Sequence, residues 1–167
     1  MNKKSIAHTL GLFIDSVLSD VHTAMPGKVE KYEYDKQRAN VKPLVRRRYS
    51  DGTEVDFPVV AGVPVVFPRS ATASITFPLE VGDTGLIIFC ERSLDRWLSK
   101  GGVTDSVYSR KFDLSDAVFI PGMYPFSEAS PAVSDKMQIQ YHKATIVIDK
   151  GGTVNINDGN LTVESGS

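Results

Sequence analysis

Apolar and polar positions alternate along residues 137–167, a pattern typical of short β-strands. Gly151-Gly152 and Asp158-Gly159 separate the strands as turn signals. A ribbon of two or three strands is only marginally stable alone in water. Because the sequence predicts no helix or second sheet that covers the apolar side of this ribbon, we expect identical copies of the same segment to cover it. The alternating apolar residues are Ile139, Tyr141, Ile146, Ile148, Val154, Ile156, Leu161 and Val163.

Residues 5–24 carry a helical period. Apolar residues recur there at spacings of three and four, which places them on one face of a helix. Ser5 is the predicted N-cap, and Pro26-Gly27 is predicted to end the element. A helix with such an apolar stripe must lie against its own domain or against a neighbouring protein. The residues of the stripe are Ile6, Leu10, Phe13, Ile14, Val17, Leu18 and Val21.

Between Val29 and Pro121 the pattern changes to strands and turns. Asp51-Gly52 is a strong hairpin signal, and Ser93–Leu98 predicts a short helix with Ser93 as its N-cap. We expect Leu94, Trp97 and Leu98 of that helix to pack inward. The predicted strands are residues 29–34, 39–46, 63–67, 73–77, 86–90 and 116–120.

This pattern predicts a mainly β protein with an OB-fold-like Greek-key barrel, because such barrels combine about five short strands with one small helix. Pro125, Pro131 and several serines and alanines in residues 122–136 are typical of an extended linker. The predicted organisation is a helix over residues 1–24, a barrel over 25–122, a linker over 123–136 and a strand segment over 137–167.

Composition restricts the environment of the chain more than its function. The 167 residues carry a net charge of −1, so the chain as a whole does not attract nucleic acid or acidic membranes. A single cysteine, Cys90, excludes an internal disulfide and a cysteine-based metal site. The N-terminus lacks the apolar core of a signal peptide, and the longest apolar run, Val59–Phe67, is too short to span a bilayer. We therefore expect a soluble protein made in a reducing cytoplasm.

No group of residues has the spacing that catalysis or metal binding requires. His8, His22 and His142 lie far apart in the sequence, and Cys90 follows an apolar strand where a small buried side chain is expected. Glu91 and Asp95 are four residues apart, but Arg92 and Arg96 beside them indicate solvated charges. Gly82-Asp83-Thr84-Gly85 lacks the lysine and following helix of a phosphate-binding loop and is predicted to be a turn. We expect no enzymatic activity, no cofactor and no metal.

One basic cluster keeps a second hypothesis open. Arg46-Arg47-Arg48-Tyr49, together with Tyr32 and Tyr34, could form the basic aromatic face that OB-folds use for single-stranded nucleic acid. Asp51, Glu54 and Asp56 follow at once and neutralise the cluster, which argues against it. The alternative to a structural role is thus an OB-fold module that binds single-stranded nucleic acid or glycan.

Four blocks of sequence resemble the N-terminal OB domain of central spike proteins, the baseplate assembly protein V-like family of contractile-tailed bacteriophages. They occur in order over residues 25–122. The blocks are Met25-Pro26-Gly27-Lys28-Val29, Val63-Pro64-Val65-Val66-Phe67-Pro68, the run from Gly82 to Trp97, and the run from Asp113 to Gly122.

The resemblance implies a homotrimer with three OB domains in a collar, followed by an intertwined trimeric β-helix or β-prism. Such a spike sits in the tail baseplate of the virion, below the hub and tail tube, and is driven through the host outer membrane when the sheath contracts. It implies assembly in the host cytoplasm and no bound nucleic acid. In this chain the residues expected to form the trimer core are Ile146, Ile148, Val154, Ile156, Leu161 and Val163.

The chain departs from the family at the expected tip. Long family members bind iron through His-x-His pairs from three chains, and this sequence contains no His-x-His. We therefore expect a shaft that a separate tip protein caps, with Leu161 and Val163 as the contact. Two alternatives remain for the N-terminal helix, which either packs on its own barrel or docks on the hub. The docking residues would be Ile6, Leu10, Phe13 and Val17.

Overall fold

The structure is a computed structural model that describes residues 3–49, 51–128 and 134–157. Contacts divide the chain into two compact units, Met1–Tyr124 and Pro125–Ser167. The elements of the first unit are α1 (Lys3–Ser19), β1 (Ala24–Glu33), the 3-10 turn η1 (Tyr34–Lys36), β2 (Arg38–Pro43), β3 (Arg47–Arg48), β4 (Glu54–Val55), β5 (Val60–Pro64), β6 (Thr84–Phe89), α2 (Asp95–Lys100) and β7 (Ala117–Pro121). Those of the second are the 3-10 turn η2 (Phe126–Glu128), β8 (Lys136–Tyr141), β9 (Ala144–Asp149) and β10 (Val154–Asn157).

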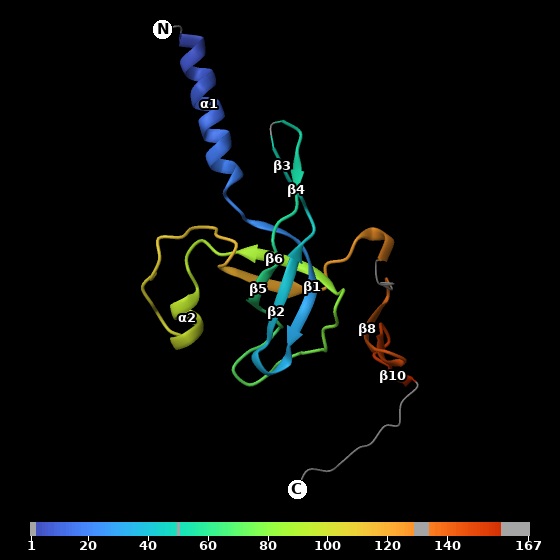
Figure 1. Ribbon diagram of the computed structural model, residues 1–167. Coiled ribbons are helices and arrows are strands. Elements are labelled where there is room, and N and C mark those ends of the chain that lie inside the picture. The colour runs from blue at the N-terminus through green and yellow to red at the C-terminus, as the bar shows by residue number, and fades with distance from the viewer. Residues whose placement is uncertain (1–2, 50, 129–133, 158–167) are drawn as a thin grey trace. The chain divides into compact units, whose positions relative to one another are not determined.

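A curled five-stranded sheet forms the centre of the first unit, with strands in the order β5-β2-β1-β6-β7 (Figure 1). All neighbouring strands in it are antiparallel. Its two edge strands approach each other, where Val65 and Phe119 form a parallel bridge and the Val66 N–H donates to the Phe119 carbonyl at 2.8 Å. The sheet is therefore consistent with an OB-like fold, as the strand pattern predicts.

The inner face of this sheet carries the hydrophobic core. Alternate residues of each strand point inward, and Val29, Val41, Ile87 and Phe119 are completely buried. Burial of a side chain of this size contributes about 1.5–3 kcal/mol each. The other buried apolar residues are Ala39, Val60, Val63, Val65, Phe67, Leu79, Phe89 and Ala117.

The predicted end of the N-terminal helix is wrong. α1 ends at Ser19, and Pro26-Gly27 lies within β1 instead of terminating the helix. Strand pairing overrides the local signal, because β1 pairs with β6 from Ala24 onward and the Pro26 carbonyl accepts from the Leu44 N–H at 2.9 Å. Proline is tolerated in a strand where no partner needs its missing N–H.

The predicted strand over residues 73–77 is also wrong. Within it, Ser74 makes only an isolated bridge with Arg69. The hydroxyl of Ser70 accepts hydrogen bonds from the amides of Thr72 and Ala73, so the segment closes on itself as a turn. Phe77 then packs edge-on against Phe67, with ring centroids 5.0 Å apart. The chain here forms a loop next to the barrel.

The short helix exists, but its details differ from the prediction. α2 begins at Asp95 after Leu94, and no side chain caps it. The Ser93 hydroxyl instead contacts the Asp95 carboxylate and the Arg110 guanidinium. Trp97 is 54% exposed and Leu98 39% exposed, so the expectation that they pack inward is wrong. α2 has no buried residue and contributes none to the core cluster.

The second unit is a three-stranded antiparallel meander with strand order β10-β9-β8. Tight connections join its strands: His142 adopts a left-handed conformation with φ of 51°, and Gly152 one with φ of 83°. The predicted strands of this segment are therefore present up to Asn157. Leu161 and Val163 lie outside the described residues.

Candidate functional site

The β8–β9–β10 meander separates apolar and polar side chains onto its two faces. Directly paired residues share a face of a sheet. Ile139 pairs with Ile146, and Ile146 pairs in turn with Ile156. On the opposite face, Gln138 pairs with Val147, and Val147 pairs with Asn155. One face therefore carries Met137, Ile139, Tyr141, Ala144, Ile146, Ile148, Val154 and Ile156.

This apolar face is open in the single chain. Ile146 is 39% exposed, Val154 56% and Ile156 44%, while Ile148 is half-buried. Met137, Ile139 and Tyr141 of β8 are more than half exposed. A contiguous exposed apolar face of this kind marks an interaction surface. The face brings together the four predicted trimer-core residues that the structure describes.

Helix α1 forms a second open apolar surface. Every residue from Ile6 to Asp20 is exposed. Of the four predicted docking residues, Ile6 is 48% exposed, Leu10 56%, Phe13 66% and Val17 50%. In the single chain these side chains are thus free to contact another surface.

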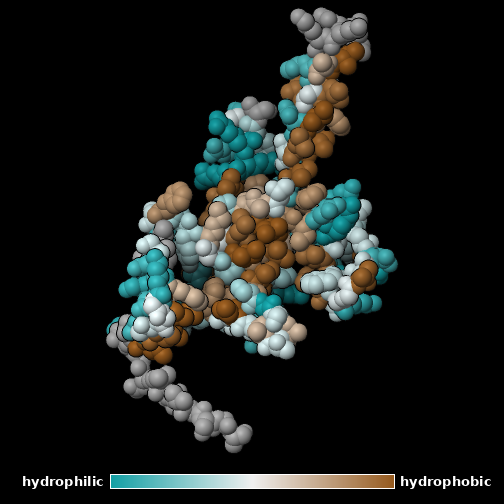
Figure 2. All heavy atoms as spheres, turned by 180° about the vertical axis from the view of Figure 1, so that it is seen from behind, coloured by the Kyte–Doolittle hydropathy of each residue, from teal (hydrophilic) through white to brown (hydrophobic). Residues whose placement is uncertain are grey.

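A third apolar surface lies on the outside of the barrel, and sequence reasoning missed it. Leu86 pairs with Ile120, and Ile88 with Val118, on the face of β6 and β7 that points away from the core. Figure 2 shows apolar side chains gathered over the middle of the barrel in the view from behind. A solvent-facing side of an antiparallel sheet is normally polar. The sequence does show that consecutive residues of these two strands are apolar, which makes both faces of the pair apolar, but it does not show which face the core covers.

This outer face continues into a groove of about 710 Å³. Val118, Cys90 and Val66 contribute to its lining, together with Trp97 and Leu98 of α2 and the loop formed by residues 69–74. Burial raises the pKa of the Cys90 thiol, and the nearby Asp116 carboxylate raises it further. Cys90 is therefore a poor nucleophile at neutral pH.

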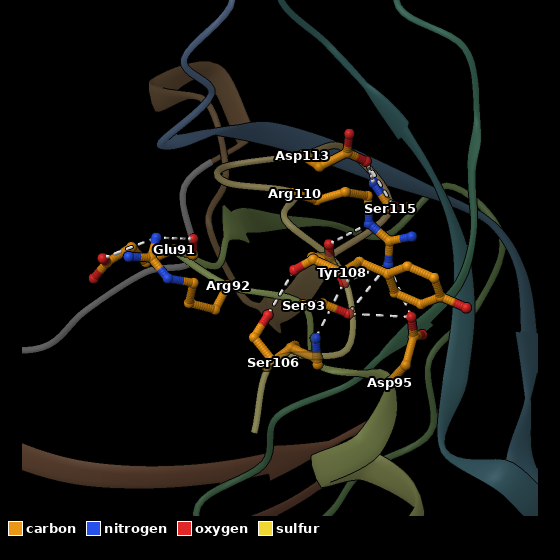
Figure 3. A network of polar contacts seen from close by, with 11 residues as sticks. Glu91, Arg92, Ser93, Asp95, Ser106, Tyr108, Arg110, Asp113 and Ser115 are labelled. Atoms are coloured by element: carbon orange, nitrogen blue, oxygen red, sulfur yellow. Dashed lines mark hydrogen bonds and ion pairs between the residues drawn. The ribbon is translucent and has the colours of Figure 1, made fainter. Parts of the chain in front are cut away.

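A polar network beside the groove anchors α2 to the barrel (Figure 3). Arg110 donates from Nε to Asp116 Oδ2 at 2.9 Å and from Nη2 to Asp95 Oδ2 at 2.8 Å. The buried Asp116 carboxylate also accepts from the Leu94 N–H at 3.1 Å. The hydrogen bond that Arg110 donates lowers the pKa of Asp116, and acceptance of its hydrogen bonds by Asp116 and Asp95 raises the pKa of Arg110. The network satisfies a buried charge, which is a structural role.

The carboxylates considered for acid–base chemistry have different partners. Glu91 pairs with Arg92 at 3.2 Å, whereas Asp95 pairs with Arg110. Figure 3 shows Glu91 and Asp95 in separate groups of contacts. Among the described residues, no cluster of three or more histidine, cysteine or acidic side chains could hold a metal ion.

Two of the aromatic residues of the nucleic-acid hypothesis, Tyr32 and Tyr34, lie at the opposite end of one hairpin from the arginines, whereas Tyr49 lies beside them, with the Arg47 guanidinium 5.2 Å from its ring centroid. Tyr32 pairs with Ala39 near the turn between β1 and β2, while Arg46 follows Pro43, which pairs with Gly27 at the other end. Five residues of strand separate these ends by roughly 17 Å. Two of the three arginines pair with acidic side chains, Arg46 with Asp56 at 2.9 Å and Arg47 with Asp20 at 2.5 Å. The two groups do not form one binding face.

Comparison with protein families assigns the barrel. Residues 25–122 match the model of the phage protein Gp138 N-terminal domain, and the match covers more than half of the chain. The chain belongs to this family. Membership in the Gp138 N-terminal domain family makes it a phage protein, in agreement with the phage part of the resemblance. The matched residues are the same ones over which the four sequence blocks occur.

A comparison with curated proteins finds no match. None of the helices within the described residues is long and apolar enough to cross a membrane. The family and the β-rich fold together indicate a phage-related structural role.

Proposed function

We propose that the protein is a structural subunit of a phage tail baseplate. Three copies form a central spike, or a shaft that connects the hub to a separate tip protein, and this assembly helps to pierce the host outer membrane when the tail sheath contracts. The family match over residues 25–122 supports the phage assignment. The resemblance of the four sequence blocks to spike OB domains supports the position in the baseplate.

The open apolar face of the β8–β9–β10 meander carries the proposal of a trimer. Three such sheets that face a common axis would remove Ile146, Ile148, Val154 and Ile156 from water and leave Asn155 outside. Burial of about 100 Å² per side chain would contribute roughly 2.5 kcal/mol each, before the entropy cost of assembly. The arrangement would also cover sheet edges that otherwise invite aggregation.

We assign a different partner to each end of this trimer. Leu161 and Val163 would meet the tip protein, and the hub or tail tube would lie at the other end. The host outer membrane is a transient partner. The role is structural and not catalytic.

Light scattering on the purified full chain tests the proposal. The expected mass is about three times that of the 18.3 kDa chain. The double substitution Ile146→Asp and Ile156→Asp places charges on the apolar face and should weaken the trimer, so that it dissociates at concentrations at which the wild-type protein remains trimeric. Thr145→Asp with Asn155→Asp is the matched control on the polar face of the same two strands and should leave the mass unchanged. A monomeric wild-type protein that shifts single-stranded DNA in a gel would refute the proposal and favour the binding module.

A further inference from the structure

The segment that connects α1 to β1 directs the helix away from its own sheet. His22 lies between two rings, with centroids 5.3 Å from Phe57 and 5.6 Å from Phe89. The Thr23 carbonyl accepts from the Phe89 N–H at 2.9 Å, and Asp20 pairs with Arg47. A helix that folded back over its own β1 would have to reverse the chain within residues 20–23 and break these contacts. The apolar stripe of α1 is therefore available to another chain.

The barrel offers a surface that suits such a helix. The outer face of β6 and β7 carries Leu86, Ile88, Val118 and Ile120, and Val118 also lines the groove beside α2. The stripe from Ile6 to Val17 is about 17 Å long at the α-helical rise. The five residues of β7 extend over a somewhat shorter length, about 13 Å. A helix packed on the apolar face of a sheet is one of the standard layer arrangements of proteins.

On the premise of the trimer proposed above, threefold symmetry indicates which surface of a neighbouring copy α1 contacts. In a ring of three, each interface joins two different surfaces of neighbouring copies, whereas contact between two identical patches produces a dimer. The first unit has two unlike apolar surfaces, the stripe of α1 and the outer face of β6 and β7. Covering the stripe would bury roughly 700 Å² on the helix, close to the ~800 Å² per partner of a stable interface.

We propose that α1 of each protomer packs on the outer face of β6 and β7 of the next protomer and lies in its groove. The three helices thereby link the three barrels into a closed ring. This contact is separate from the apolar core that the β8–β9–β10 meanders are proposed to form.

Cysteine cross-linking of the full chain tests this contact, because Cys90 already lies in the groove. Since the raised pKa slows the reaction of this thiol, cross-linking is carried out at mildly alkaline pH, and labelling of Cys90 in the wild-type protein by N-ethylmaleimide is verified first by mass spectrometry. Three variants introduce a second cysteine on the stripe: Leu10→Cys, Phe13→Cys and Val17→Cys. After treatment with a short bismaleimide, we expect at least one of them to give a covalent trimer on a denaturing gel, since each protomer is linked through its helix and through its groove. Ser16→Cys, on the polar side of α1, and the wild-type protein should give no trimer band.

The alternatives give different products. In a Cys90→Ser background the trimer band must disappear; a covalent dimer that persists there would mean that the helices contact one another, and it would overturn the proposal. A cross-linked species that runs as a monomer would place α1 on its own barrel and would also overturn it. The absence of any product from all three variants would also overturn it, provided that light scattering shows the protein to be trimeric and that Cys90 reacts with N-ethylmaleimide. A Ser16→Cys trimer band as strong as that of Phe13→Cys would overturn it as well. Monomeric protein in the scattering measurement refutes the proposed function itself.

Discussion

Gly27 lies directly opposite Gly85 where β1 pairs with β6, and both positions face the core of the barrel. Larger neighbours fill the space that side chains would occupy there. A Cβ atom on Gly27 would lie 2.6 Å from the Ile87 side chain. One on Gly85 would lie 2.5 Å from the Phe119 ring and would also meet the Ile120 carbonyl oxygen. Because these two positions lack side chains, Ile87 can pack directly against the backbone at Gly27 and Phe119 against the backbone at Gly85.

Gly85→Ala should therefore destabilise the barrel. The added methyl group meets a backbone oxygen, which cannot move away like the end of a flexible side chain, and overpacking of this kind typically costs about 1–3 kcal/mol. Chemical denaturation followed by tryptophan fluorescence measures the free energy of unfolding through Trp97. Gly11→Ala is the control, because a Cβ there has nothing within 4 Å and alanine favours a helix. An unchanged free energy of unfolding in Gly85→Ala would contradict the close approach.

The Arg110–Asp116 pair predicts a second loss of stability. Arg110→Ala removes the cation that pairs with the Asp116 carboxylate, which is 2% exposed, and leaves it with the neutral donors Leu94 N–H and Ser93. An unpaired buried charge is costly, and we expect a loss of about 3 kcal/mol in the free energy of unfolding. Arg92→Ala removes a guanidinium whose partner Glu91 is exposed, so its expected loss is below about 1 kcal/mol. Equal losses in both variants would show that the network does not hold α2 on the barrel.

The same pair predicts a dependence of stability on pH. The hydrogen bond from Arg110 lowers the pKa of Asp116 in the folded protein, so the folded state favours the charged carboxylate. The stabilisation is complete above the unfolded-chain pKa of about 4 and is lost as the pH falls through the lower folded-state pKa. Asp116→Asn should thus be less stable than wild type at neutral pH, and the difference should shrink below about pH 4. Urea denaturation at a series of pH values measures the difference in free energy of unfolding between the two proteins. A difference that stays constant down to acidic pH would contradict a lowered pKa of Asp116 in the folded state.

Alternation along the sequence was sufficient to predict most strands, because a half-buried strand requires a period of two. It succeeded for β8 to β10 and predicted the apolar face that contains Ile146 and Ile156. It failed at Pro26-Gly27, where both residues are local signals for a helix end but pairing with β6 determines the structure. Local signals describe a segment by itself, and strand pairing depends on a segment sixty residues away in sequence.

The outer face of β6 and β7 could not be predicted from its apolar run alone. The run from Leu86 to Cys90 is typical of a strand buried on both sides, and it does not indicate which molecule covers the second side. The structure supplies the missing information, since Ile87 is completely buried by the chain's own core while Ile88 is only half-buried. An apolar side chain such as Ile88, which the chain's own core does not cover, indicates a surface that another molecule contacts.

Assembly through the apolar face of the meander predicts that thermal stability depends on protein concentration. If three chains must associate to bury Ile146 and Ile156, mass action stabilises the assembled state by about 0.9 kcal/mol per protomer for each tenfold rise in concentration. Circular dichroism melts of the full chain at several concentrations should therefore show a rising midpoint. The Ile146→Asp, Ile156→Asp variant should retain a barrel transition, because the core around Val29 and Phe119 is formed within one chain. Its midpoint should depend less on concentration than that of the wild-type protein, since only the contacts of α1 then remain between chains. A concentration-independent midpoint in the wild-type protein would contradict a trimer that is coupled to folding of the meander.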